Sequence, residues 1–355
     1  MSARNRARAF SATLGIDTPI LLAPMAGASA PALSIAVANA GGFGACGALL
    51  MQPDDIRAWA ATVRAASGNR FQLNLWVPDP PPVRDNAREA AVRGLLRNWG
   101  PEVPAAAGDA TPPDFGAQCD ALLEIAAPVV SSVMGLFPAP FVERAHANGI
   151  KWFAIVTTLR DARLAEDAGA DAVVVQGMEA GGHRGAFVAA DAEREMVGLF
   201  SLLPVVVDRV KVPVIAAGGI ADGRGVAAAL TLGASAVAIG TGFLRCPEAQ
   251  IHPAWADAIG RAAPEQTTIS RVFSGRPGRS IRTKYVEAAT APDAPPPADY
   301  PVQRGLTSLM RREAASAGDV DRMQPWAGQS SLLASAEPAA DLLRRMWADA
   351  QTLLP

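Results

Sequence analysis

The chain has 355 residues, a formal net charge of −2 at pH 7 and a sequence pI near 6.0. Half of the residues are hydrophobic and 19% are charged, so bulk charge gives no general attraction to nucleic acid or to an anionic membrane surface. The sequence also contains no uninterrupted apolar run of transmembrane length. These properties predict a soluble protein with a small-molecule ligand and exclude partners recruited by net charge.

The three cysteines, Cys46, Cys119 and Cys246, are widely spaced and form no C-x-x-C pair. An odd number of isolated cysteines predicts neither a disulfide framework nor a zinc site, so we expect no bound metal. Free thiols of this kind are typical of a reducing compartment, and we expect the protein in the cytoplasm.

Short apolar runs alternate with helix-length segments along most of the chain. Strands alternating with helices predict βαβ units and a parallel sheet, and eight strands favour an α/β fold of the closed (β/α)8 TIM barrel type. An open, doubly wound sheet is the alternative. The eight predicted strands are Pro19–Pro24, Gly42–Cys46, Phe71–Val77, Val129–Met134, Trp152–Val156, Ala172–Gln176, Val212–Ala217 and Ala236–Gly240.

Two stretches interrupt this alternation. Residues 78–114 are rich in proline and contain one predicted helix, Arg84–Trp99, which indicates an insertion after the third strand. From residue 267 the alternation ends. We therefore predict a barrel over residues 1–266 and a C-terminal extension over 267–355 that packs on the barrel. Because active sites of such barrels lie at the C-terminal ends of the strands, the extension is expected to contribute a lid over the substrate.

One predicted strand ends at Gln176 and continues directly into a glycine-rich loop that contains His183. Glycines in this loop, among them Gly181 and Gly182, let a ligand approach the backbone closely. A histidine held there can exchange a proton near neutral pH, which makes His183 the candidate catalytic residue. The alternative is a tight surface loop whose histidine caps a helix or binds a carbonyl group.

The last two predicted strands both end in small residues. Gly218 and Gly219 follow one of them. The next strand ends with Ala238, Ile239, Gly240 and Thr241. This tandem arrangement is typical of the phosphate site formed by the final loops of a barrel, where backbone N–H groups and a helix dipole bind an anion. Two ordinary turns between strand and helix are the alternative.

The pattern of nucleotide motifs favours FMN as the cofactor. No G-x-G-x-x-G follows the first strand and no P-loop motif is present, so a mononucleotide fits better than a dinucleotide or ATP. The amides of Asn74 and Gln176 lie at strand ends, where they can bind the polar edge of a flavin ring. Ala23, Pro24 and Met25 can present backbone and a polarizable side chain to the ring. An unligated core that places amides at these positions is the alternative.

The chain resembles the nitronate monooxygenase family, formerly called 2-nitropropane dioxygenase. The resemblance covers most of the chain and extends to two tail motifs that are similar to the bacterial class I branch. The same barrel and flavin site occur in flavin-dependent enoyl reductases and in a quinone-reducing branch. The matching motifs are residues 19–27 (PILLAPMAG), 176–183 (QGMEAGGH), 213–220 (PVIAAGGI) and 240–244 (GTGFL), with tail residues 273–277 (FSGRP) and 326–329 (WAGQ).

This resemblance implies an FMN-dependent oxidative denitrification. Alkyl nitronates such as propionate 3-nitronate would be oxidised by O2 to a carbonyl compound and nitrite, by one-electron transfer through a flavin semiquinone. His183 would stabilise the nitronate anion or act as a general base on a neutral nitroalkane. The resemblance also implies a substrate pocket lined by aromatic residues, and Tyr300, one of two tyrosines in the chain, is the candidate here.

Two other functions remain open on the same barrel. One is an NAD(P)H-dependent flavin reductase of quinones or enoyl thioesters, and the other is a non-catalytic FMN-binding barrel. In each case we expect no nucleic acid or membrane partner, and a monomer or homodimer. The cluster of Arg276, Arg279, Arg282 and Lys284 is expected to form a solvated face or to anchor the lid.

Overall fold

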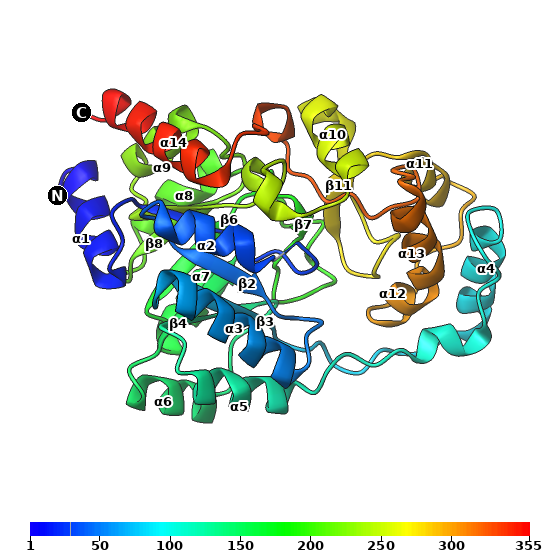
Figure 1. The fold of residues 1–355 in the computed structure, drawn as a ribbon. Helices are drawn as coiled ribbons and strands as arrows, with labels where there is room; N and C mark the ends of the chain where they lie inside the picture. Colours follow the sequence, from blue (N-terminus) through cyan, green and yellow to red (C-terminus); the bar gives the residue numbers. More distant parts are fainter. Residues whose placement is uncertain (29) are drawn as a thin grey trace.

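The computed structural model describes residues 1–28 and 30–355, and its centre is a sheet of eight parallel strands (Figure 1). The strand order is β1-β9-β8-β6-β5-β4-β3-β2. Each strand overlaps one of the eight predicted runs. Their bounds are β1 (Ile20–Leu22), β2 (Gly44–Gly47), β3 (Phe71–Trp76), β4 (Val129–Val133), β5 (Lys151–Val156), β6 (Ala172–Gln176), β8 (Val214–Ala217) and β9 (Ala236–Ile239).

The sheet closes on itself where β1 meets β2. The amide of Leu22 donates to the carbonyl oxygen of Phe43 at 2.8 Å, and the amide of Phe43 donates to that of Ile20 at 3.2 Å. Leu21 and Phe43 form a parallel bridge at this junction. The predicted (β/α)8 barrel is therefore confirmed, and the open sheet is excluded.

Helices surround the barrel and bury their apolar faces against it. In α3, a capping box formed by Gln52 and Asp55 fixes the first turn, and Ile56, Trp59 and Val63 face inward. None of the helices in the described part of the chain has the length and apolarity needed to cross a bilayer. The surrounding helices are α2 (Pro31–Asn39), α3 (Pro53–Ser67), α5 (Phe115–Ile125), α6 (Ala139–Ala147), α7 (Leu159–Asp167), α8 (Leu199–Val207), α9 (Gly223–Thr231) and α14 (Ala339–Leu353), while α1 (Ala3–Leu14) packs against the barrel interior.

Alternation along the strands divides the core in two. In β6, Val173 and Val175 pack in the cluster between sheet and helices, whereas Val174 belongs to the cluster inside the barrel. Phe10 of α1 joins the inner cluster and lies 6.1 Å, between ring centroids, from Phe153. Helix α1 thus contributes side chains to the barrel interior and leaves the opposite, C-terminal end of the strands for a ligand.

The insertion and the tail build a second lobe beside the strand ends, where Figure 1 shows α4 next to α11, α12 and α13. A three-stranded antiparallel sheet, β10-β11-β7, joins this lobe to the barrel. The remaining elements are α4 (Asn86–Leu96), η1 (Ala105–Asp109), β7 (Gly182–His183), η2 (Thr241–Phe243), η3 (Pro247–Ala249), α10 (Pro253–Arg261), η4 (Pro264–Gln266), β10 (Thr267–Ser270), β11 (Gly278–Ile281), α11 (Lys284–Ala289), α12 (Val302–Leu306), α13 (Ser308–Ala317) and η5 (Ser331–Leu333).

The final helix returns to the barrel. Helix α14 packs against α9 and α2, so it takes the place of the eighth surrounding helix (Figure 1). A Cβ on Gly223 of α9 would lie 2.5 Å from the Cβ of Asp349, which shows how closely the two helices approach. The division predicted at residue 267 stays a prediction, and the segment after it supplies both the second lobe and this helix.

Candidate active site

A cavity of about 330 Å³ lies at the C-terminal ends of the barrel strands. One predicted cofactor residue, Ile239, does not line it: its side chain is buried in the core between sheet and helices, and its carbonyl oxygen accepts from the amide of Ala23 at 2.9 Å. The predicted residues that line the cavity are Ala23, Pro24, Met25, Asn74, Gln176, Gly181, Gly182, His183, Gly218, Gly219, Ala238, Gly240 and Thr241.

One wall of the cavity is backbone without side chains. Gly218 and Gly219 have φ angles of +102° and +70°, a region that favours glycine. A Cβ on Gly240 would lie 3.3 Å from Sδ of Met25, and one on Gly181 would lie 2.5 Å from the amide nitrogen of Gly328. The protein leaves little room for a side chain at these positions, and we call Gly181, Gly218, Gly219 and Gly240 the glycine cradle.

The helix that follows Gly218 and Gly219 is capped by its own chain. The Asp222 carboxylate accepts from the amide of Gly225 at 3.0 Å and pairs with Arg224. The first turn of α9 therefore already holds a negative group. This negative group opposes the predicted contribution of the helix dipole to anion binding.

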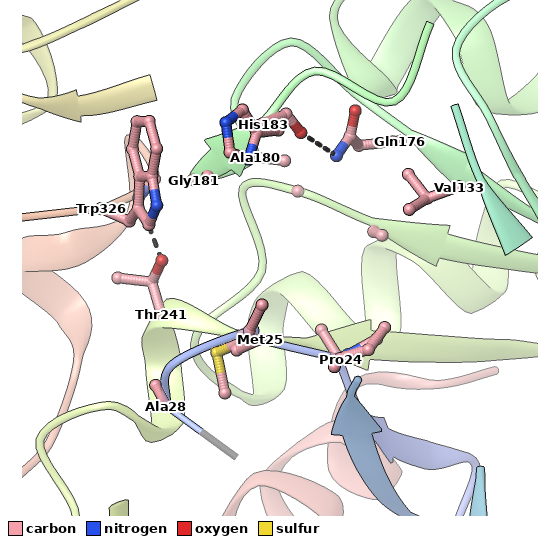
Figure 2. A pocket seen from close by; sticks show the side chains of 18 of the residues that line it. Pro24, Met25, Ala28, Val133, Gln176, Ala180, Gly181, His183, Thr241 and Trp326 are labelled. Carbon is pink, nitrogen blue, oxygen red and sulfur yellow. Dashed lines mark hydrogen bonds between the residues drawn. The ribbon is translucent and has the colours of Figure 1, made fainter. Parts of the chain in front are cut away.

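The tail closes over the glycine cradle. The amide of Gly328 donates to Oγ1 of Thr241 at 3.0 Å, and Oγ of Ser330 donates to the carbonyl oxygen of Gly219 at 2.7 Å. Figure 2 shows Thr241 beneath Trp326, on the side of the cavity opposite Pro24 and Val133. Tail residues are thus part of the cavity wall, although they lie almost ninety residues from Thr241 in the sequence.

The side-chain amides of Gln176 and Asn74 differ in which of their atoms remain free to hydrogen-bond a ligand. Gln176 donates from Nε2 to the carbonyl oxygen of His183 at 3.0 Å and accepts at Oε1 from the amide of Gly185 at 2.9 Å, so it braces the histidine loop (Figure 2). Asn74 donates from Nδ2 to the backbone and side-chain oxygens of Ser131. Its Oδ1 has no hydrogen-bond partner among the described residues, so Asn74 is the amide able to accept a further hydrogen bond.

His183 lies in an aromatic cage. Its ring centroid is 4.9 Å from those of both Trp76 and Trp326. Its Nε2 lies 2.7 Å from Oγ of Ser274, and that hydroxyl donates to the carbonyl oxygen of Arg276. The Ser274 hydroxyl thus links Nε2 of His183 to the backbone of Arg276 and fixes the orientation of the ring.

The surroundings of His183 keep the imidazole neutral. Burial, and then the charges of Arg276, Arg304 and Arg311, lower its pKa to about 3. This lowered pKa argues against proton exchange by His183 near neutral pH, and its role in catalysis stays a prediction. The composition of the loop could not reveal this, because burial of the ring is the largest cause of the shift and the contributing cations come from the tail.

The cavity wall also contains two arginines, Arg304 and Arg311, that the sequence analysis did not identify as site residues. Burial lowers the pKa of Arg304, and burial together with Arg304 lowers the pKa of Arg311 to about 9. Arg311 is braced by Oγ1 of Thr307, Oε1 of Gln324 and the carbonyl oxygen of Arg304. Within residues 1–28 and 30–355, neither has a carboxylate partner, and the Arg304 guanidinium donates no hydrogen bond.

The remaining predicted residues lie outside this cavity. Tyr300 stacks on Trp76, with ring centroids 4.6 Å apart, and lines a neighbouring cavity. In the basic cluster, Arg276 is 1% exposed and pairs with Asp79, and Arg279 is 7% exposed. These two are therefore not solvated, and the Arg276–Asp79 pair anchors the tail to the insertion, as the second interpretation of the cluster predicts.

The family model described as nitronate monooxygenase matches residues 8–349. The chain belongs to the nitronate monooxygenase family. This family consists of flavin-dependent oxidoreductases. A nitronate monooxygenase from Pseudomonas aeruginosa is 38% identical over 344 residues, which cover 95% of this chain and 97% of that protein.

Solved structures agree with this family and with the barrel. A nitroalkane oxidase from Streptomyces ansochromogenes has a TM-score of 0.86 at 34% identity, over 95% of this chain and 97% of the other. FabK from Thermotoga maritima has a TM-score of 0.75 at 30% identity, over 96% and 95% of the two chains. The barrel with its tail is thus common to the nitronate monooxygenase family and to FabK.

Proposed function

We propose that the chain oxidises alkyl nitronates with O2, using FMN, to a carbonyl compound and nitrite. One observation carries the proposal: a single cavity at the strand ends combines the glycine cradle with Arg304, a half-buried cation that lacks a protein partner. An anionic cofactor group and an anionic substrate each find complementary chemistry there. Bound FMN would supply the one-electron chemistry by which the nitronate is oxidised with O2.

The residues present fit FMN. The glycine cradle lines the cavity with backbone, and backbone N–H groups are the donors that a phosphate group requires. Asn74 has a free side-chain oxygen for an N–H group of the flavin ring, and Met25 of the first strand end lines the same cavity. Gln176 would act on the flavin site by holding the histidine loop in place.

Arg304 and Arg311 suit an anionic substrate. A charge removed from water without a partner is costly, and a bound anion would offset this cost for Arg304. Arg311 is held by three hydrogen bonds, so it raises the local positive potential and supports the backbone of Arg304. We assign the nitronate anion to the Arg304 side of the cavity.

His183 favours nitronates over neutral nitroalkanes. A nitronate has already lost its proton, whereas a nitroalkane must be deprotonated before oxidation. An imidazole whose pKa lies near 3 is a weak base at neutral pH. We therefore assign to His183 the orientation of the substrate and expect much slower turnover of nitroalkanes.

The test uses purified protein, propionate 3-nitronate in one cuvette and NADH without O2 in another. Oxygen uptake and nitrite release with the nitronate are expected, together with the visible spectrum of a flavin that releases FMN on denaturation. Flavin reduction by NADH without nitronate turnover would replace the proposal by a reductase function. Bound FMN with neither reaction would indicate a non-catalytic barrel.

Replacing His183 tests its role. His183→Asn is expected to lower kcat for nitronates at least tenfold, because the orienting ring is lost, while FMN remains bound through the glycine cradle. Steady-state oxygen uptake and the flavin absorbance per protein measure the two effects separately. Unchanged kinetics would remove His183 from the mechanism.

A further inference from the structure

A second cavity, of about 320 Å³, adjoins the candidate active site, and we call it the side chamber. It lies between the insertion and the start of α12. Leu49 and Trp76 line both cavities. The opposite walls of the side chamber consist of prolines at 80–82 and 112–113, with Tyr300 from the tail.

The charged residues that line the side chamber lie in ion pairs, whereas Arg304 of the candidate active site has no carboxylate partner among the described residues. Asp79, one of the two acidic residues of the side chamber, accepts from Nε of Arg276 at 2.8 Å. Its basic residue Arg84 donates to Glu89 at 2.6 Å and to Asp109 at 2.7 Å. With these charges paired, proline rings and aromatic faces dominate the lining, which suits a hydrocarbon chain.

The wall between the two cavities contains polar atoms that lack partners. Trp76 and Tyr300 stack with 14° between their ring planes. Among the described residues, Nε1 of Trp76 and Oη of Tyr300 are buried without a hydrogen bond. Buried donors of this kind are rare and costly, so the closed stack is not the best arrangement for these two side chains. Separating the rings would let both atoms reach water.

We propose that the side chamber receives the aliphatic tail of a longer-chain nitronate whose anionic head lies near Arg304. The Trp76–Tyr300 stack parts to let the chain pass. The identity of the head group rests on the proposed function, whereas binding in the side chamber needs no turnover. Burial of each methylene should tighten binding about fourfold until the chamber is filled.

The test measures binding of n-alkanoates, from propionate to octanoate, to the FMN-loaded protein by calorimetry. A carboxylate is a planar anion like a nitronate, and it is not oxidised. We expect Kd to fall about fourfold per methylene for chains that extend beyond the active site. A series in which chain length has no effect would overturn the proposal.

Blocking the side chamber gives the decisive comparison. Ala110→Trp and Thr111→Trp each place an indole at an exposed position that lines the side chamber. In both variants, hexanoate and longer chains should no longer bind more tightly than shorter ones. Ala106→Trp, an exposed neighbour in η1 that does not line the chamber, should behave like the unsubstituted chain. Thermal unfolding checks that each variant folds. If the fold decrease in Kd per methylene is unchanged in folded Ala110→Trp or Thr111→Trp, the side chamber is not the site of the aliphatic tail.

Opening the wall tests the passage itself. Tyr300→Leu removes one ring of the stack, so hexanoate should bind more tightly because no stack has to be broken. Weaker hexanoate binding would contradict the passage. Nitrite release from propyl-1-nitronate is measured in parallel: its absence would overturn the proposed function, while the alkanoate series would still decide the side chamber.

Discussion

His183 shows how far the environment of one residue can move its chemistry. A histidine is expected to titrate near neutral pH, but two tryptophan rings and nearby arginines give this one a pKa of about 3. Its Nε2 is committed to Ser274. The residue therefore acts as an oriented neutral ring.

The low pKa of His183 makes the fold sensitive to acid. The unfolded chain binds a proton at this residue below pH 6.5, whereas the folded chain does so near pH 3, so stability is lost as the pH falls between these values. From pH 7 to pH 5 this residue should remove about 2 kcal/mol from the free energy of unfolding. His183→Gln should reduce the pH dependence by that amount in urea unfolding. An equal pH dependence in both proteins would contradict the shift.

Arg304 should determine how strongly the anionic substrate binds. Arg304→Gln is expected to raise KM for a nitronate at least tenfold, about 1.4 kcal/mol, because the charged partner is lost. Arg304→Lys should recover part of the loss. Arg312→Gln, which changes an exposed arginine on the following helix α13, is the charge-matched control and should leave KM unchanged. The same increase in both glutamine variants would indicate a general electrostatic effect.

At the scale of elements, two helical glycines should respond to alanine in opposite ways. In α9, a Cβ on Gly223 would lie 2.5 Å from Asp349 Cβ and 2.8 Å from the carbonyl oxygen of Met346, so Gly223→Ala should cost about 2 kcal/mol of stability. In α4, a Cβ on Gly94 meets nothing within 4 Å, so Gly94→Ala should gain about 1 kcal/mol from helix propensity. Urea unfolding compares them. Equal effects would mean that α14 does not pack as described.

The barrel elements and the helix of the insertion, α4, could be predicted from the sequence, but the packing of the tail in the lobe could not. Strands buried on both faces appear as continuous apolar runs, so a strand such as the one containing Val173–Val175 can be recognised from the sequence alone. Arg304 and Trp326 carry no such local signal, because their place depends on how the tail folds back. The same reason explains why α14 was not predicted as the eighth surrounding helix.

At the scale of the whole molecule, one buried ion pair joins the insertion to the tail. Arg276 is 1% exposed, and Asp79 is its carboxylate partner. Asp79→Asn should leave a buried unpaired charge and cost about 3 kcal/mol of stability. The matched control is Asp54→Asn, which removes a 95% exposed partner of Arg57 and should cost less than about 1 kcal/mol. Urea unfolding that shows equal costs would mean that this pair does not hold the lobe.

The pairing of β7 with β11 places His183 opposite Gly278 in a sheet shared by barrel and tail. The histidine is thus held in position by a strand almost a hundred residues further along the chain. In protein engineering, this means that the tail cannot be exchanged as a separate module. A chimera that combines this barrel with a relative's tail would inherit a mismatched partner strand for its own histidine loop, unless the loop and β11 are transplanted together.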